Sequence, residues 1–117
     1  MKMQVVTAGP GWRSINVEHQ LDRTAAPMVC DALIHAAAGE ESNLLIDLEA
    51  VDAADGQGIA ALIAAVRRVR VEHPSVRVAV LAHRALLADA FERKLPVADV
   101  FRSRREAHAA IAARAAA

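Results

Sequence analysis

The chain has 117 residues, of which 55% are hydrophobic and 24% are charged. This length and composition are typical of one folded domain over residues 1–117, and they exclude a disordered chain. The 14 basic and 14 acidic residues balance, which excludes a net positive field for nucleic acid.

Cysteine usage and hydropathy predict the compartment. The single cysteine, Cys30, has no intrachain partner for a disulfide, which suits a reducing compartment. It falls inside a helical pattern, so we expect a packed thiol rather than a nucleophile. No apolar run approaches the roughly 18 residues of a membrane span, and the first residues lack the pattern of a cleaved signal. We therefore expect a soluble cytoplasmic protein without membrane insertion.

The first elements in chain order are two strands. Residues 3–6 form a short apolar run, and Gly9-Pro10-Gly11 then signals a turn. Residues 13–19 alternate, with Ile15 and Val17 on one face, as in a half-buried strand. The pattern predicts a hairpin with Trp12 near its tip.

A helix and a buried strand come next. Asp22 or Thr24 can cap the helix, and Pro27 is tolerated in its first turn. One helical face carries Val29, Leu33, Ala36 and Ala37. Gly39 ends this pattern. Residues 42–48 contain the run LLIDL, which is typical of a central strand covered on both faces.

The stretch VDAADGQGIAAL, residues 51–62, follows that strand. We expect a loop over residues 49–55 and an N-cap at Asp55. The helix after it carries apolar residues at helical spacing: Ile59, Leu62, Ile63, Val66 and Val69.

The rest of the chain continues the alternation of strands and helices. We expect a strand over residues 76–81, a helix over 85–95, an edge strand over 97–101 and a helix over 104–115. Leu86, Leu87, Ala90 and Phe91 recur at helical spacing in the first of these helices. The fold class is therefore α/β, with an N-terminal β-hairpin followed by alternating helices and mostly parallel strands in a mixed sheet.

The sequence supports other kinds of functional site only weakly. Residues 56–61 match the G-x-G-x-x-A dinucleotide pattern, but a true fingerprint follows its strand directly and an acidic residue follows the next strand. The four carboxylates Asp47, Glu49, Asp52 and Asp55 lack the lysine and acidic pair of a phosphoacceptor site, so we expect them in loops and caps. The five histidines lack metal-ligand spacing, so we expect no metal site, no cofactor and no catalytic residue.

Three segments in order, residues 20–33, 44–70 and 76–111, resemble the STAS domains, the anti-sigma-factor antagonist family. The first is similar to the family's Leu-Asp start of the first helix, in QLDRTAAPMVCDAL. The second is similar to its strand, short loop, Asp-Ser-Ser-Gly-Leu motif and second helix, and the third to its later strand, helix and terminal segment.

The resemblance implies a non-enzymatic module that binds a partner protein, an anti-sigma factor of the serine kinase kind. The implied contact residues are the switch loop Asp55, Gly56, Gln57, Gly58 and Ile59, and its two glycines would let the partner backbone come close. Family members carry a phosphorylated serine or threonine where this chain has Gly56, and a second serine where it has Gln57. Since neither residue accepts a phosphate, we expect a partner-binding protein without the switch.

The resemblance leaves other functions open. STAS domains also serve as accessory subunits of lipid-transport ABC systems, as sensors of small ligands or nucleotides, and as scaffolds. A homodimer is also open at this point.

Overall fold

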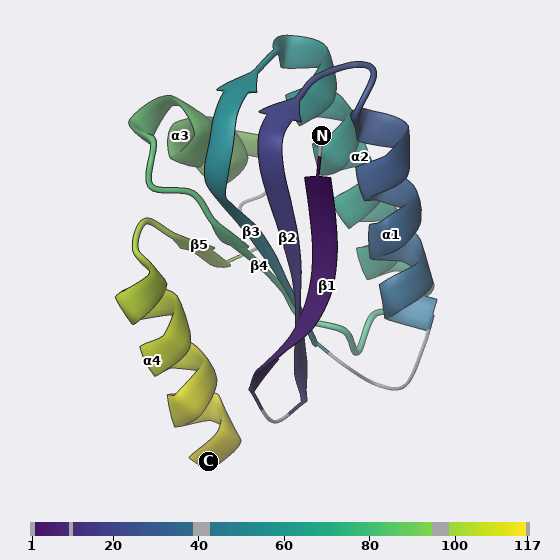
Figure 1. Ribbon diagram of the computed structural model, residues 1–117. Helices are drawn as coiled ribbons and strands as arrows, with labels where there is room; N and C mark the ends of the chain where they lie inside the picture. The colour runs from purple at the N-terminus through teal and green to yellow at the C-terminus, as the bar shows by residue number, and fades with distance from the viewer. Residues whose placement is uncertain (1, 10, 39–42, 95–98, 117) are drawn as a thin grey trace.

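The computed structural model describes residues 2–9, 11–38, 43–94 and 99–116. Its elements follow one another in the predicted order (Figure 1). The strands are β1 (Lys2–Gly9), β2 (Trp12–Leu21), β3 (Asn43–Ala54), β4 (Val78–Leu81) and β5 (Asp99–Phe101). The helices are α1 (Ala26–Ala38), α2 (Gly56–Glu72), α3 (Ala85–Lys94) and α4 (Arg104–Ala116).

The strands form one sheet in the order β1-β2-β3-β4-β5. β1 and β2 make the predicted antiparallel hairpin, with Gly9 opposite Trp12 beside the turn. The pairs β2–β3, β3–β4 and β4–β5 are parallel. Parallel neighbours need a long crossover, and α1, α2 and α3 supply it in turn. The predicted fold class is confirmed.

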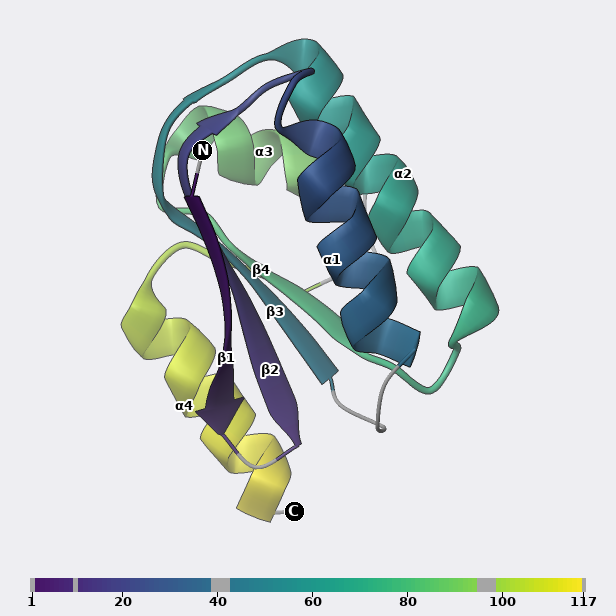
Figure 2. The same ribbon diagram turned by 45° about the vertical axis from the view of Figure 1, so that its right-hand side comes forward.

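Helices cover both faces of the sheet, with α1, α2 and α3 on one face and α4 on the other (Figure 2). The main core lies under the three helices and includes these buried side chains: Ile15, Val17, Leu33, Ile46, Leu62, Val66, Val80 and Phe91. A smaller second core lies under α4 and consists of Trp12, Leu45, Ala79, Leu81, Ala107 and Ile111. The predicted helical faces of α1 and α2 are confirmed by the burial of their apolar residues.

β3 is longer than the sequence predicted. The apolar run ends at Leu48, but pairing with β2 continues to Ala54, with two register shifts along β2. β4 pairs with residues 44–47 of β3, so the extension beyond them runs beside β2 on one side. The extension of β3 therefore has a neighbouring strand on one side. Such a segment does not need the continuous apolar sequence of a central strand, which is why the apolar run ends at Leu48.

This extension corrects two predictions. Glu49 and Asp52 lie in a strand and not in a loop, and so does Asp47. The predicted loop before the dinucleotide-like pattern is also wrong, because Asp55 alone separates β3 from α2. The other objection to that pattern remains, since Ala82, His83 and Arg84 follow β4 where an acidic residue would be needed.

Other boundaries moved by a few residues. β4 begins at Val78, two residues later than predicted, and Val76 precedes it as part of the core. Four predicted boundaries lie outside the described residues: the helix ends at Gly39 and at residue 95, and the strand starts at Ser42 and Val97.

Candidate functional site

The N-terminus of α2 follows directly on β3, and Asp55 caps it. The Asp55 backbone is extended (φ −111°, ψ 167°), and its Oδ1 accepts a hydrogen bond of 2.7 Å from the Gly58 N–H. The Ile59 N–H donates to the Asp55 carbonyl at 3.0 Å. The predicted cap is confirmed, and it satisfies an amide that the first helical turn leaves without a helical partner.

Gly58 is buried against the chain's own backbone. A Cβ at this position would stand 2.9 Å from the Cα of Asp22 and 2.6 Å from the carbonyl carbon of Leu21, and closer still to the carbonyl oxygen. The Asp55 N–H also donates to the Leu21 carbonyl at 3.1 Å, which holds the start of α2 against the end of β2. The missing side chain of Gly58 therefore makes room for the backbone of the same chain. The prediction that this glycine lets a partner backbone come close is corrected.

Gly56 and Gln57 are exposed at the start of the helix. A Cβ on Gly56 would meet nothing within 4 Å, and its backbone does not have a positive φ. A side chain of any ordinary kind therefore fits at residue 56. The exposed part of the predicted loop consists of Asp55, Gly56 and Gln57, while Ile59 is half-buried.

An apolar hollow of about 490 Å³ lies beside this helix start. It is lined by Ala54, Ile59, Arg84, Ala85, Leu86 and Leu87, and we call it the α2–α3 groove. The sequence pattern groups Leu86 with Leu87 among the apolar residues of α3, but Leu86 is 87% exposed, whereas Leu87 is buried. The sequence signal was ambiguous because two leucines stand side by side at the first turn, and the buried face of α3 continues through Leu87, Ala88 and Phe91 without Leu86.

Three polar residues meet next to the groove. Arg84 donates through Nη1 to the carbonyl of Asp52, and the Asp52 Oδ2 lies 3.5 Å from the His19 Nδ1. His19 has φ of 73°, in the left-handed region, at one of the register shifts of β2. The His19 side chain is exposed.

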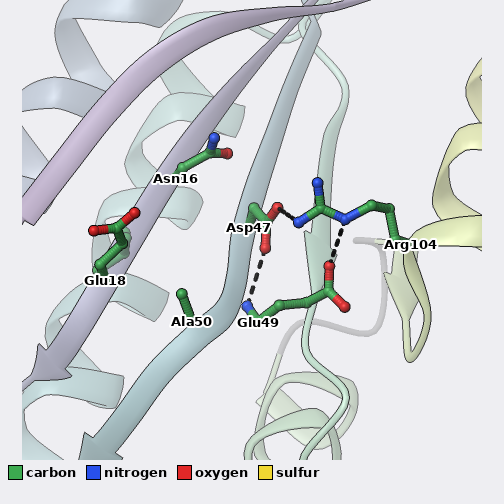
Figure 3. A pocket seen from close by; sticks show the side chains of 7 residues that line it. Asn16, Glu18, Asp47, Glu49, Ala50 and Arg104 are labelled. Carbon is green, nitrogen blue, oxygen red and sulfur yellow. Dashed lines mark hydrogen bonds and ion pairs between the residues drawn. The ribbon is translucent and has the colours of Figure 1, made fainter.

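A second hollow lies on the opposite face of the sheet, beside α4. Arg104, at the start of α4, reaches two carboxylates of β3 (Figure 3). Its Nη2 lies 3.0 Å from the Asp47 Oδ2, and its Nε lies 2.8 Å from the Glu49 Oε1. The hollow measures about 310 Å³, and Asn16, Val17, Glu18 and Ala50 complete its lining.

This polar cluster anchors a helix. The Asp47 side chain is 8% exposed, and its other oxygen accepts from the Glu49 N–H at 3.0 Å. The hydrogen bond to Glu49, and then the charge of Asp47, raise the pKa of Arg104 above its usual range, so the guanidinium keeps its charge. Ser103 caps the same helix by accepting from the Glu106 N–H at 3.1 Å. No local sequence pattern indicates this contact, because Asp47 and Arg104 are 57 positions apart in the chain.

The four carboxylates singled out in the sequence do not form one site. Asp47 and Glu49 hold Arg104, Asp52 faces His19, and Asp55 caps α2. Among the described residues, no group of histidine, cysteine and carboxylate side chains is arranged to hold a metal ion.

Cys30 is half-buried in α1, as the sequence predicted. Its Sγ donates to the Ala61 carbonyl of α2 at 3.4 Å. Burial raises the pKa of the thiol, and the charge of Asp31 raises it further. A thiol that resists ionisation is a poor nucleophile, which agrees with a packing role.

In the part of the chain that the structure describes, no helix combines the length and the apolar character needed to cross a membrane.

We compared the chain with known protein families and solved structures. The sequence matches the STAS domain over residues 5–107. No curated protein matches the sequence.

Several solved structures share the fold. An anti-sigma-factor antagonist (STAS) domain protein from Planctomyces limnophilus has a TM-score of 0.74 and 19% identity, over 94% of this chain and 97% of that one. An anti-sigma factor antagonist from Mycobacterium paratuberculosis has a TM-score of 0.71 and 18% identity, over 93% and 92%. The anti-sigma factor antagonist SpoIIAA in its unphosphorylated form has a TM-score of 0.71 and 15% identity, over 97% and 98%.

These identities are low, so the solved structures establish a shared fold. The match of the sequence itself runs from β1 into α4 and includes the capped start of α2. The chain belongs to the STAS domain family.

Proposed function

We propose that the protein is a non-catalytic interaction module that binds a partner protein, an anti-sigma factor of the serine kinase kind. The binding surface comprises the exposed start of α2 (Asp55, Gly56 and Gln57) and the α2–α3 groove. We call the two together the α2–α3 surface.

The observation that carries this proposal is the exposed apolar surface beside an open helix start. Leu86 is 87% exposed at the rim of the groove, next to the half-buried Ile59. A groove with an apolar floor and a polar residue at its rim, here Arg84, is the usual composition of a protein-binding patch.

The solved structures of similar fold support the choice of partner. Two of them are named as anti-sigma factor antagonists from other organisms. SpoIIAA of Bacillus is described in both an unphosphorylated and a phosphorylated form. An antagonist role therefore agrees with the fold. The next question is whether this chain can be phosphorylated, as SpoIIAA is in one of these structures.

The missing hydroxyl makes this member a constitutive binder under our proposal. The sequence contains no serine, threonine or tyrosine between Ser42 and Ser75, a stretch that spans all of α2. A phosphate on this helix start would add nearly two negative charges next to Asp55. Without that charge, binding would be set by the amounts of the two proteins or by a ligand.

The first experiment adds a charge to the surface at Gly56. The open space around Gly56 admits an aspartate without a clash. We expect Gly56→Asp to weaken partner binding at least about tenfold, or roughly 1.4 kcal/mol, because the carboxylate must lose water in the interface. The partner is captured from the source cell with the wild-type protein, identified by mass spectrometry and titrated by calorimetry.

A matched control is Val71→Asp, since Val71 is 80% exposed near the other end of α2. It adds the same charge to the same helix and should leave the affinity within about twofold. Leu86→Ala tests the groove separately, and it should weaken binding while leaving stability within about 0.5 kcal/mol. Unchanged affinity for both Gly56→Asp and Leu86→Ala would contradict the proposed surface.

The second experiment tests the missing switch. The wild-type protein is incubated with the captured partner and ATP, and its intact mass is measured. We expect no added phosphate, whereas a Gln57→Ser or Gly56→Ser variant offers the hydroxyl and serves as the positive comparison. A stoichiometric phosphate on the wild-type chain, for example on Ser42 or Ser75, would show that the protein is switched after all.

A further inference from the structure

The outer edge of β1 is open. β1 is the first strand in the order of the sheet, and among residues 2–9, 11–38, 43–94 and 99–116 no strand other than β2 pairs with it. Figure 1 shows β1, in dark purple, at the free side of the sheet. An edge strand presents a row of unpaired N–H and C=O groups, which is a template for another strand.

β1 lacks most of the features that protect an edge strand from pairing. Its sequence KMQVVTAG has no proline, and its single charge is Lys2 at the start. Register in the pairing with β2 is regular from Lys2 to Thr7, and the irregularity between Thr7 and Gly9 lies at the far end. Proteins keep edges unpaired with inward charges, prolines or bulges along the strand, and the middle of β1 has none of these.

Apolar side chains flank this open edge on both faces of the sheet. Val5 is 47% exposed and Val6 is 42% exposed, although both belong to a β-branched type that favours a packed sheet. Successive residues of a strand point to opposite faces. Met3 packs against the main core, so Val5 lies on the face of α1 and Val6 on the face of α4.

The helices leave room beside the edge. α1 contacts β2 and β3 rather than lying along β1. α4 approaches β1 near the hairpin turn, where a Cβ on Gly9 would stand 3.2 Å from the Ile111 side chain. Residues 2–6 are remote from that contact along the strand, so a strand from another molecule can approach them.

We propose that a second copy of this chain occupies the edge, with the two β1 strands antiparallel and a two-fold axis perpendicular to the sheet beside Val5 or Val6. Such a pairing continues the sheet from one copy into the other and keeps the helices of both copies on matching faces. The two-fold operation places the same patch on both sides of the interface, as in most homodimers.

A second copy fits this edge better than an unrelated strand, because the strand is complementary to itself. Antiparallel pairing brings the valines at its middle together across the axis, and such β-branched pairs stabilise a sheet. The only charged residue of β1 is at position 2, so antiparallel pairing puts the two copies of that position at opposite ends of the interface. A partner with acidic residues along its strand would find one lysine to pair with, at the end of β1.

The proposal is independent of the α2–α3 surface. β1 lies at one edge of the sheet, and the groove involves α3, which follows β4 toward the other edge. A dimer formed through β1 would leave both grooves free and would be bivalent, which raises the apparent affinity for a partner that is itself oligomeric.

The experiment measures the mass of the chain by sedimentation equilibrium from about 1 to 500 μM, a range that covers weak and moderate interfaces. We expect a monomer–dimer equilibrium for the wild type. Val6→Lys should raise the dimer dissociation constant at least about tenfold, because it puts a positive charge from each copy at or next to the two-fold axis. The matched control Val71→Lys makes the same change at an exposed valine of α2 and should leave the constant within about twofold.

A disulfide crosslink tests the position of the interface independently of the lysine variant. In a Cys30→Ser background, Val5→Cys and Val6→Cys are oxidised, since directly opposed residues of antiparallel strands have Cα atoms close enough for a disulfide. We expect one of the two to give a covalent dimer, while Val71→Cys gives none.

Three results would overturn the proposal. The first is a wild type that stays monomeric at about 500 μM, and the second is a mass above that of a dimer, because a two-fold interface closes on itself. The third is a dimer that neither responds to Val6→Lys nor crosslinks at residues 5 and 6.

Discussion

Gly56 and Gly58 lie one residue apart at the start of α2, and their surroundings differ. Gly58 faces the backbone of Leu21 and Asp22 at distances that no Cβ tolerates, whereas Gly56 faces open space. A glycine in a sequence shows that a side chain is absent, but the neighbours decide whether one could be added. The pair therefore combines a structural residue with an exposed position that is free to vary.

This difference predicts opposite effects of the same substitution. Gly58→Ala should lower the free energy of unfolding by about 2 kcal/mol or more, because the new methyl group meets backbone that cannot move aside. Gly56→Ala should raise it by about 0.4–1 kcal/mol, because alanine restricts the unfolded chain without strain in the helix. Urea denaturation of both variants measures the two values, and equal effects would contradict the assigned roles.

At the scale of the element, α4 shows how a weakly apolar helix is held on the sheet. Ala107 and Ile111 are its residues in the second core, a small apolar contact. The ion pairs of Arg104 with Asp47 and Glu49 fix its first turn, and Ser103 caps it. Arginine is unfavourable at a helix N-terminus, so this placement depends on the two carboxylates.

We expect Arg104→Ala to lower the free energy of unfolding by about 1–2 kcal/mol, because Asp47 loses its charged partner in a mostly buried position. Arg105→Ala is the matched control, because it removes the same charge from the next, exposed residue of the same turn. Its effect should stay within about 0.5 kcal/mol. A loss in Arg105→Ala as large as that in Arg104→Ala would show that the ion pairs contribute nothing specific.

The raised pKa of Arg104 places its titration in strong alkali. A group whose pKa is higher in the folded state contributes stability that is present at lower pH and lost only as the pH rises through that value. The guanidinium therefore contributes throughout the neutral range, and the Arg104→Ala comparison can be made at any neutral pH.

At the scale of the whole molecule, the sheet has two covered faces and an open edge (Figure 2). The main core and, as the first surface, the α2–α3 surface lie on the face of α1, α2 and α3, and helix α4 lies on the other face. The open edge of β1 lies between the two faces. A partner on the first surface and a second copy at the edge can therefore bind together. The dimer proposed above belongs to this scale, since it needs the strand order of the complete sheet.

Much of this molecule could be predicted from the sequence. The order of strands and helices, the hairpin at Trp12, the buried faces of α1 and α2 and the cap at Asp55 depend on local patterns, and the structure confirms them. Apolar periodicity and capping act over a few residues, so one segment carries the whole signal. The STAS resemblance was likewise visible in the order of three segments.

The tertiary structure alone decided the rest. The extension of β3 to Ala54 depends on its pairing with β2, the burial of Gly58 depends on Leu21, and the anchor of α4 joins Asp47 to Arg104. The exposure of Leu86 rather than Leu87 and the open edge of β1 depend on what packs beside them. Each of these features depends on which distant segments of the chain lie beside it, and local sequence patterns carry no information about which distant segment will be the neighbour.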